Sequence, residues 1–245
     1  MKALARWIAL LVLAGCALEL FFIVRIALAA TMDPQSTTFQ RSEAWRIASQ
    51  KGQLRWRHEW VPYERISENL KRAVIAAEDD SFATHDGVDW EALEKAWEKN
   101  QKAEERAAKL QARARASAPP RPVKIVGGST ITQQLAKNLL LSGERTLLRK
   151  GQEIVLTFAL ERMLSKERIL EIYLNSVEWG EGVFGAEAAA RHYYRKGAGQ
   201  LTAWEAARLA VMLPRPKYFE KLPNSGYLAA RASTIAARMR AAELP

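Results

Sequence analysis

The sequence predicts a mainly α-helical protein that is preceded by one transmembrane helix. Apolar residues recur at steps of three and four after residue 60, as at Ile66, Leu70 and Val74. Signals for helix starts precede several of these segments: a capping serine, or a threonine followed three residues later by glutamine or glutamate. We find no convincing strand longer than three or four residues and no internal repeat.

Residues 7–30 form an apolar run of the length that a helix needs to cross a bilayer. Two charges interrupt it. Arg25 can reach the interface, whereas Glu19 is harder to place without a partner in the membrane. A cleaved signal peptide would be shorter, and apolar sequence continues after the lipoprotein-like box that ends at Cys16. We therefore expect an uncleaved anchor.

The charges that flank this run predict its orientation. Lys2 and Arg6 precede it, so we expect residues 1–6 to stay in the cytoplasm and residues 31–245 to be exported. The net charge of +10 indicates an anionic partner, which could be nucleic acid, a phospholipid surface or a phosphate-bearing substrate. Nucleic acid fits the charge but not an exported domain. One cysteine excludes an internal disulfide, and three histidines without paired spacing argue against zinc.

The exported part is expected to begin irregularly and then to become helical. Pro34, Gly52 and Pro62 interrupt the first segment, in which we expect Trp45 to pack against the body. The stretch 154–160 is apolar nearly all round, which predicts that it runs through the core. Helices are expected over residues 67–78, 91–116, 130–139, 147–164, 166–175, 186–194, 202–212 and 227–240.

The segment 91–122 is unusual in composition. It reads as a charged helix with Trp90, Leu93 and Trp97 on one side, ended by a stiff proline-rich linker at 118–122. It is either a solvated helix with a hinge or, at its arginine-rich end, a basic arm that lies on an anionic membrane.

Two adjacent carboxylates, Glu78 and Asp79, end the first apolar helix, and Phe82, His85 and Gly87 follow them. A carboxylate backed by an apolar helix is partly desolvated, which raises its pKa toward the value that a general base needs. A solvated helix end with scattered charge explains the same spacing equally well.

A second dense signal begins with two glycines, 127 and 128, which let a backbone approach a neighbour closely. Thr130 and Gln133 have the spacing of a capping box, so a helix starts here and its free N–H groups favour phosphate. Three polar residues share one face of that helix: Gln134, Lys137 and Asn138. The Walker spacing is absent, and a capped surface helix is the alternative.

A third signal opens the helix at residue 147. Arg149, Lys150 and Glu153 stand within one turn of each other. They form either a buried ion pair within the helix or a pair of cations beside an acid at the entrance of a cleft.

Together these stretches resemble, in order, the five motifs of the family 51 peptidoglycan glycosyltransferases. The resemblance covers about residues 60 to 220, and a chain of this length leaves no room for a transpeptidase domain, so it points to the monofunctional, membrane-anchored members. The matching stretches are Glu78-Asp79-x-x-Phe82-x-x-His85-x-Gly87, residues 127–138, Arg149-Lys150-x-x-Glu153, residues 166–175, and residues 188–194 with Leu209-Ala210 and Pro214-x-Pro216.

The resemblance implies a lysozyme-like helical domain with a small membrane-facing subdomain, to which the mobile, charged segment 91–122 would belong. It also implies polymerisation of lipid II at the outer face of the bacterial inner membrane. The growing undecaprenyl-pyrophosphoryl chain would be the donor and the 4-hydroxyl of lipid II the acceptor, in one inverting displacement. Partners would be lipid II, the glycan chain, the membrane and proteins of cell-wall synthesis and division, with no nucleic acid.

The same resemblance assigns roles to individual residues. Glu78 would be the general base, and Glu153 the second acid, acting near the departing pyrophosphate directly or through a divalent cation. No cofactor would be obligatory, although Mg²⁺ or Mn²⁺ could serve at the pyrophosphate, and no residue is assigned as a metal ligand. Arg149, Lys150 and Lys137 would neutralise the pyrophosphate. The residues that would shape and bind around the site are Asp79, Phe82, His85, Thr130, Gln134 and Asn138.

Two departures from the family pattern stand out. Val126 replaces the basic residue that many relatives carry before the paired glycines, and the chain between the first two motifs is longer than usual. Two other classes of function stay open. A glycan-cleaving lysozyme or lytic transglycosylase would share the fold but would not need the cations or the anchor, whereas an inactive scaffold would not need Glu78 and Glu153.

Overall fold

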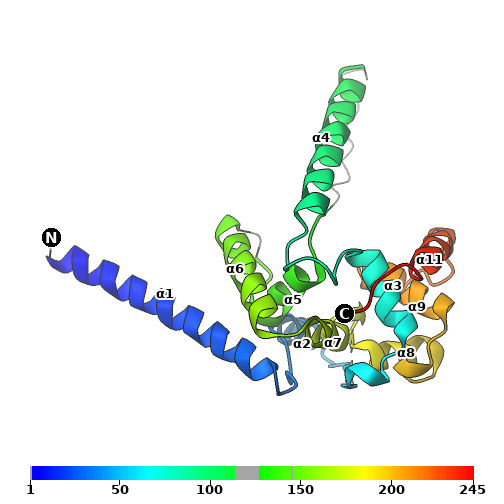
Figure 1. Ribbon diagram of the computed structural model, residues 1–245, viewed down its shortest axis with the longest axis horizontal. Coiled ribbons are helices and arrows are strands. Elements are labelled where there is room, and N and C mark those ends of the chain that lie inside the picture. The colour runs from blue at the N-terminus through cyan, green and yellow to red at the C-terminus, as the bar shows by residue number, and fades with distance from the viewer. Residues whose placement is uncertain (1, 114–126, 145) are drawn as a thin grey trace.

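A computed structural model of the protein describes residues 2–113, 127–144 and 146–245. It is mainly helical, as the sequence predicts, and two long helices project from a body of packed shorter ones (Figure 1). The helices are α1 (Lys2–Ala29), α2 (Thr38–Lys51), α3 (Glu68–Glu78), α4 (Trp90–Arg113), α5 (Ile131–Leu140), α6 (Leu147–Met163), α7 (Lys166–Ser176), α8 (Ala186–Tyr194), α9 (Ala203–Met212), α10 (Pro216–Phe219) and α11 (Gly226–Arg238), with short 3-10 turns at Tyr63–Arg65 and Ala198–Gln200.

The predicted helix starts are confirmed by their caps. The Ser67 side chain accepts a hydrogen bond from the backbone N–H of Leu70, and Thr130 and Gln133 cap each other reciprocally at the start of α5. Thr202 and Glu205 do the same for α9. These contacts satisfy N–H groups that have no partner within the helix.

A small sheet of three very short strands lies beside the helices. Its strands are β1 (Arg57–His58), β2 (Glu178–Gly180) and β3 (Val183–Phe184). β3 lies between the other two, parallel to β1 and antiparallel to β2. None of the strands in the described part of the chain exceeds three residues, as expected, and β2 places the side chain of Glu178 beside the site.

The core is built where α3 packs on α9 and where α5 packs on α6 and α7. Leu70 and Val74 of α3 and Ile131 and Leu135 of α5 are fully buried in it. Burial of such side chains supplies about 1.5–3 kcal/mol each relative to exposure. This packing fixes the C-terminal end of α3 close to the N-terminal end of α5.

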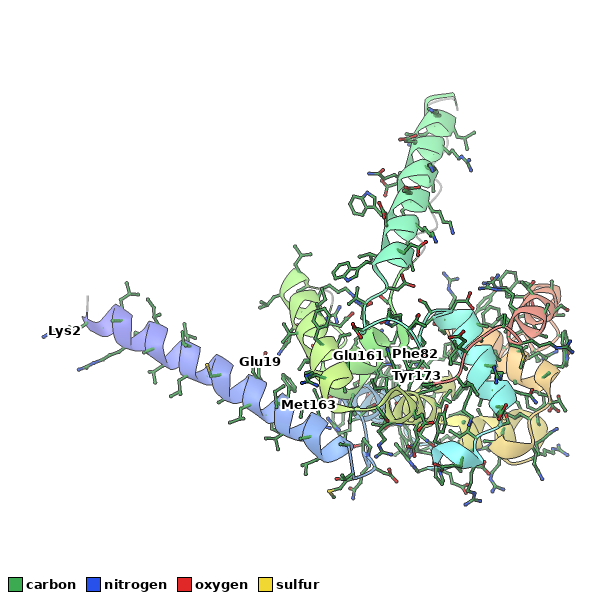
Figure 2. The ribbon with its side chains drawn as sticks, in the orientation of Figure 1. Lys2, Glu19, Phe82, Glu161, Met163 and Tyr173 are labelled. Carbon is green, nitrogen blue, oxygen red and sulfur yellow. The ribbon has the colours of Figure 1, made fainter. Side chains whose placement is uncertain are left out.

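Helix α1 is long and apolar enough to cross a membrane, and only 6% of its most apolar window is buried in the protein. Its distal part packs on α6, with Phe22 and Ile26 buried. There the amide of Gln152 in α6 donates a hydrogen bond to Glu19 (3.2 Å), whose position along α1 is labelled in Figure 2. Glu19 therefore has the partner that the apolar run requires, and α1 suggests a membrane anchor.

The prediction that residues 154–160 run through the core is wrong. Leu156 and Leu160 are fully buried, but Val155 is 55% exposed and Phe158 45% exposed. Helix α6 also contacts α1, and its exposed apolar side chains lie outside the packed core. Apolar residues all round a helix fit a lipid-facing helix as well as a core helix.

The irregular segment expected after the anchor instead contains α2. Thr37 and Gln40 form a capping box at its start, and Gly52 ends it with a left-handed backbone (φ +66°) that suits glycine. Trp45 in α2 is 76% exposed, so the expectation that it packs against the body is wrong. The cap signals were present in the sequence, whereas the face that α2 turns to the body depends on tertiary contacts.

Helix α4 projects from the body in Figure 1, away from the direction taken by α1. Trp90, Leu93 and Trp97 share one side of it, as expected, and all three are exposed. The base of the helix approaches the paired glycines so closely that a Cβ on Gly128 would lie 3.1 Å from the Leu93 Cα. The proline-rich linker at 118–122 lies outside the described residues.

Candidate active site

Glu78 is the last residue of α3 and is half-buried at the edge of a cleft. Gln134 of α5 donates a hydrogen bond from its side-chain amide to the Glu78 carboxylate (2.9 Å), and the buried Tyr173 hydroxyl donates to the other end of that amide (3.0 Å). Burial raises the pKa of Glu78, and the neighbouring Asp79 raises it further, while Gln134 and Lys137 oppose the shift. A carboxylate with a raised pKa is a suitable general base.

Asp79, the neighbour of Glu78, is turned into the protein and holds two segments together. Both of its carboxylate oxygens contact the His85 Nε2 (2.9 and 3.0 Å), and one accepts the backbone N–H of Ile131 at the start of α5 (2.9 Å). The backbone N–H of Gly87 donates to the His85 Nδ1, so the neutral ring carries its proton on the nitrogen that faces Asp79. A negative charge at a helix N-terminus is also stabilising.

Thr130 completes this connection. Besides capping α5, its hydroxyl donates to the Gly87 carbonyl oxygen (2.6 Å). Gly87 has φ +89°, and a Cβ there would meet Glu161 and Thr157 at 2.8 Å, so glycine is required. The stretch after Glu78 and the start of α5 therefore form one fixed unit.

Phe82 lies behind the site rather than on its wall. It is fully buried, and the ammonium group of Lys166 lies 4.7 Å from the centre of its ring. It packs edge-on against His85. Phe82 and His85 line neither of the cavities that reach Glu78. Their observed contacts fix the position of Asp79.

The cations face Glu78 across the cleft from the first turns of α6. Glu153 is 3% exposed and accepts hydrogen bonds from Arg149 (2.7 Å) and Lys150 (2.5 Å). The sequence left open a buried ion pair within the helix or cations beside an acid in a cleft. The structure shows both, because Arg149 pairs with Glu153 within α6 and both residues line the cleft. The Arg149 Nε is buried without a hydrogen-bond partner among the described residues.

The cleft has a volume of about 780 Å³, which is within the range of ligand sites. It brings together residues from α3, α5 and α6 that are far apart in the sequence, with a half-buried acid on one side and cations on the other. The predicted site residues that line it are Glu78, Gln134, Lys137, Asn138, Arg149, Lys150 and Glu153. Asp79 and Thr130 line a second cavity beside Glu78 instead.

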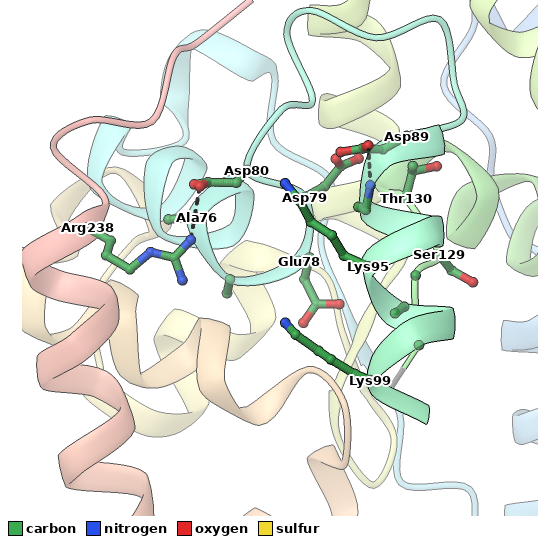
Figure 3. A pocket seen from close by; sticks show the side chains of 15 residues that line it. Ala76, Glu78, Asp79, Asp80, Asp89, Lys95, Lys99, Ser129, Thr130 and Arg238 are labelled. Atoms are coloured by element: carbon green, nitrogen blue, oxygen red, sulfur yellow. Dashed lines mark hydrogen bonds and ion pairs between the residues drawn. The ribbon is translucent and has the colours of Figure 1, made fainter. Parts of the chain in front are cut away.

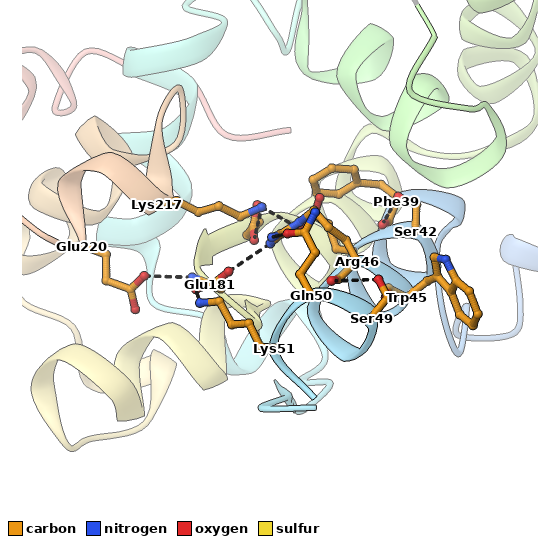
Figure 4. Close-up of polar contacts among 12 residues, drawn as sticks. Phe39, Ser42, Trp45, Arg46, Ser49, Gln50, Lys51, Glu181, Lys217 and Glu220 are labelled. Atoms are coloured by element: carbon orange, nitrogen blue, oxygen red, sulfur yellow. Dashed lines mark hydrogen bonds and ion pairs between the residues drawn. The ribbon is translucent and has the colours of Figure 1, made fainter. Parts of the chain in front are cut away.

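Sequence reasoning missed another buried acid on this cleft, Glu178 of β2. It is 6% exposed, and burial raises its pKa to about 7 although Lys217 lies 3.4 Å away. Lys217 also pairs with Glu43, and Arg46 links Glu43 to Glu181, a network that joins α10 and α2 to the small sheet (Figure 4). No local signal could have found Glu178, because its neighbours come from distant segments.

The described residues contain no group of three or more His, Cys, Asp or Glu side chains that could hold a metal ion. Glu153, the acid nearest to the cations, already accepts hydrogen bonds from Arg149 and Lys150. Arg149 and Lys150 therefore supply positive charge in the cleft.

A helical protein with an acid and a cation cluster facing each other across a cleft has the layout of a group-transfer enzyme for phosphate-linked substrates. Residues 46–240 match the transglycosylase family, and the chain belongs to that family.

Relatives similar along the whole chain carry a more specific name. It is 53% identical to a biosynthetic peptidoglycan transglycosylase of Burkholderia thailandensis, over 100% of this chain and 90% of that protein. A protein of the same name from Burkholderia vietnamiensis is 53% identical over 99% of this chain and 93% of that protein. Another from Burkholderia pseudomallei is 52% identical over 100% of this chain and 90% of that protein. The protein is thus a peptidoglycan glycosyltransferase.

Proposed function

We propose that the protein polymerises lipid II into glycan strands. The acceptor 4-hydroxyl oxygen attacks C1 of the sugar at the lipid-linked end of the growing chain and gives its proton to Glu78. The C1–oxygen bond to the diphosphate breaks, and undecaprenyl diphosphate leaves with the electron pair. Attack from the face opposite the leaving group converts the α-linked donor into a β-1,4 product, by analogy with inverting glycosidases.

The observation that carries this proposal is the separation of charge across one cleft. Glu78, with its raised pKa, stands on one wall, and Arg149 and Lys150 stand on another beside Glu153. Cations fixed by a buried carboxylate are already oriented, so they stabilise the negative charge of a departing diphosphate without rearrangement. A glycan-cleaving enzyme would gain nothing from such cations.

We also propose that the domain works at the outer face of the bacterial inner membrane. Lys2 and Arg6 favour a cytoplasmic amino terminus. Glu19, the partner of Gln152, lies ten residues before the end of α1, which corresponds to about 15 Å of helix. If α1 spans the bilayer, this contact places the start of α6 within the depth of the outer leaflet, where a lipid-linked substrate is held.

The test is polymerisation of purified lipid II by the full-length protein in detergent or vesicles. We expect glycan polymer from the wild type and none from Glu78→Gln with an unchanged melting temperature. The same assay with and without a chelator tells whether a divalent cation assists at the diphosphate. Release of fragments from finished peptidoglycan without polymer from lipid II would instead favour a hydrolase, and neither product would favour a scaffold.

A further inference from the structure

A second cavity lies beside Glu78, between the end of α3 and the first turns of α4. It has a volume of about 340 Å³ and is enclosed by the end of α3, the first turns of α4 and residues 127–130. Glu78 and Ser129 line both this cavity and the larger cleft. Figure 3 shows the Glu78 carboxylate at the edge of this space, with side chains of α4 opposite. The carboxylate can therefore be approached from two sides.

Two lysines of α4 line the second cavity. Lys95 and Lys99 are one turn apart, on the same face of the helix. In Figure 3 both side chains extend toward the end of α3, and Lys99 points toward the carboxylate of Glu78. The close approach of α4 to Gly128 sets this placement, because any side chain at position 128 would push the helix away.

The acids around the cavity already have partners. Asp79 contacts His85 and the backbone N–H of Ile131. Asp80 pairs with Arg238 (3.0 Å), and Asp89 accepts hydrogen bonds from the Ser81 hydroxyl (2.5 Å) and the Ala92 backbone N–H (2.7 Å). Asp89 also attracts Lys95, whose pKa it helps to raise, whereas Asp79 and Asp80 have their partners elsewhere.

The lysines, by contrast, are poorly neutralised. Lys95 pairs with Glu91 on the exposed side of its own helix, and such surface pairs are weak. Lys99 has no hydrogen bond or ion pair with any residue in 2–113, 127–144 or 146–245, and it is exposed. Lys99 therefore offers a positive charge beside the proposed base, apart from the cations of α5 and α6.

We propose that Lys95 and Lys99 bind the anionic groups of the acceptor substrate and so guide its hydroxyl to Glu78 from the α4 side. This inference rests on the proposed function. A displacement at carbon needs the nucleophile and the leaving group on opposite sides of the reacting atom, and both substrates carry a diphosphate. The cations of the larger cleft serve the departing diphosphate, so the acceptor needs a second cationic site, and the cavity beside Glu78 supplies it.

The test separates acceptor from donor. Lipid-linked glycan chains whose terminal 4-hydroxyl is capped can act only as donors. When these chains are present at a saturating concentration, the KM for lipid II measures binding of the acceptor. We expect the double variant Lys95→Ala/Lys99→Ala to raise that KM about tenfold, as for loss of hydrogen bonds to a charged group. The KM for capped donor and kcat should stay unchanged, and Lys95→Arg/Lys99→Arg should restore acceptor binding.

The matched control is Lys102→Ala/Lys109→Ala, which removes the same charge from exposed positions of α4 that do not line the cavity. The proposal would be overturned if the KM for the acceptor did not change in the double variant. It would also be overturned if the KM values for donor and acceptor rose equally, or if the control variant raised the acceptor KM as much. A wild type that makes no polymer would refute the proposed function itself. Comparing lipid II with an analogue that lacks the stem peptide tells whether the bound anion is diphosphate or peptide carboxylate.

Discussion

The two sides of the site use similar polar residues for different purposes. Behind Glu78, Asp79 and His85 are largely buried and pair with each other and with backbone groups. In front of it, Lys137 and Lys150 project into a cleft large enough for a substrate. A polar group whose partners all belong to the protein fixes a position, whereas one that faces a cavity is available for chemistry. In the sequence motifs, residues that fix a position and residues that face a cavity stand next to each other.

From this contrast we expect substitutions of the buried residues behind Glu78 to lower the stability of the protein. Asp79→Ala leaves the His85 ring and the Ile131 N–H without their acceptor, so we expect a loss of about 3 kcal/mol in the free energy of unfolding. Denaturant unfolding measures it. The control is Asp80→Ala, which removes an exposed ion pair with Arg238 and should cost no more than about 0.5 kcal/mol. Equal losses for the two variants would contradict the assignment of Asp79 to the scaffold.

Substitutions of residues that line the cleft should instead lower the rate of polymerisation. Lys137 is exposed and lines the cleft, so Lys137→Ala should leave the melting temperature nearly unchanged. Loss of one preorganised group that stabilises developing charge typically costs about a hundredfold in kcat. Initial rates of lipid II polymerisation check this, with Lys109→Ala on α4 as a control for net charge. A large loss of stability with normal rate would place Lys137 in the scaffold instead.

Glu178 combines both properties, because it is buried and yet lines the cleft. Its pKa of about 7 in the folded protein exceeds the value of about 4.3 for an unfolded chain, so the folded state binds more protons between these pH values. Stability contributed by the protonated form is therefore lost as the pH rises from about 4.3 to about 7, by on the order of 1–3 kcal/mol.

Glu178→Gln should remove this decline, which unfolding at several pH values would measure. Glu181→Gln is a control of opposite sign, since Lys51 lowers the pKa of Glu181 and its contribution grows with rising pH. A decline that persists unchanged in Glu178→Gln would assign the titration to another group.

The smallest expected effect concerns Gln134, which connects the two sides. Its hydrogen bond favours the charged form of Glu78 and so lowers the pKa of that carboxyl. Gln134→Leu should raise the pKa of Glu78 and move the acid limb of the kcat/KM profile to higher pH. Tyr173→Phe, which only releases the far end of the Gln134 amide, should cause a smaller shift in the same direction. A shift to lower pH would contradict this role.

Much of the fold follows from local signals in the sequence. The starts of α3, α5 and α9 are set by cap residues within three positions of one another, so a single stretch contains the necessary information. The environment of a helix is not local. The apolar surface of α6 indicated a core helix, but which part of that surface is buried depends on the neighbouring helices, and Val155 and Phe158 are exposed.

The sequence predicts which residues make up the site, but not how most of them are placed relative to one another. The spacing of Arg149, Lys150 and Glu153 within one helix predicts that they meet, and they do. Nothing local distinguishes Glu78 from Asp79, because which carboxylate turns toward α5 and which toward the cleft depends on how α3 ends. Glu178 and Lys99 escaped prediction for the same reason, since their place beside the site is set by β2 and by the approach of α4 to Gly128.

The central claim is that Glu78 is the base of a glycan polymerase. It is tested most directly by the initial rate of polymer formation from lipid II by the wild type and by Glu78→Gln at equal folded concentration. We expect polymer from the wild type and a rate lower by at least about a hundredfold in the variant, with the same melting temperature. Polymer at the wild-type rate from Glu78→Gln would contradict it.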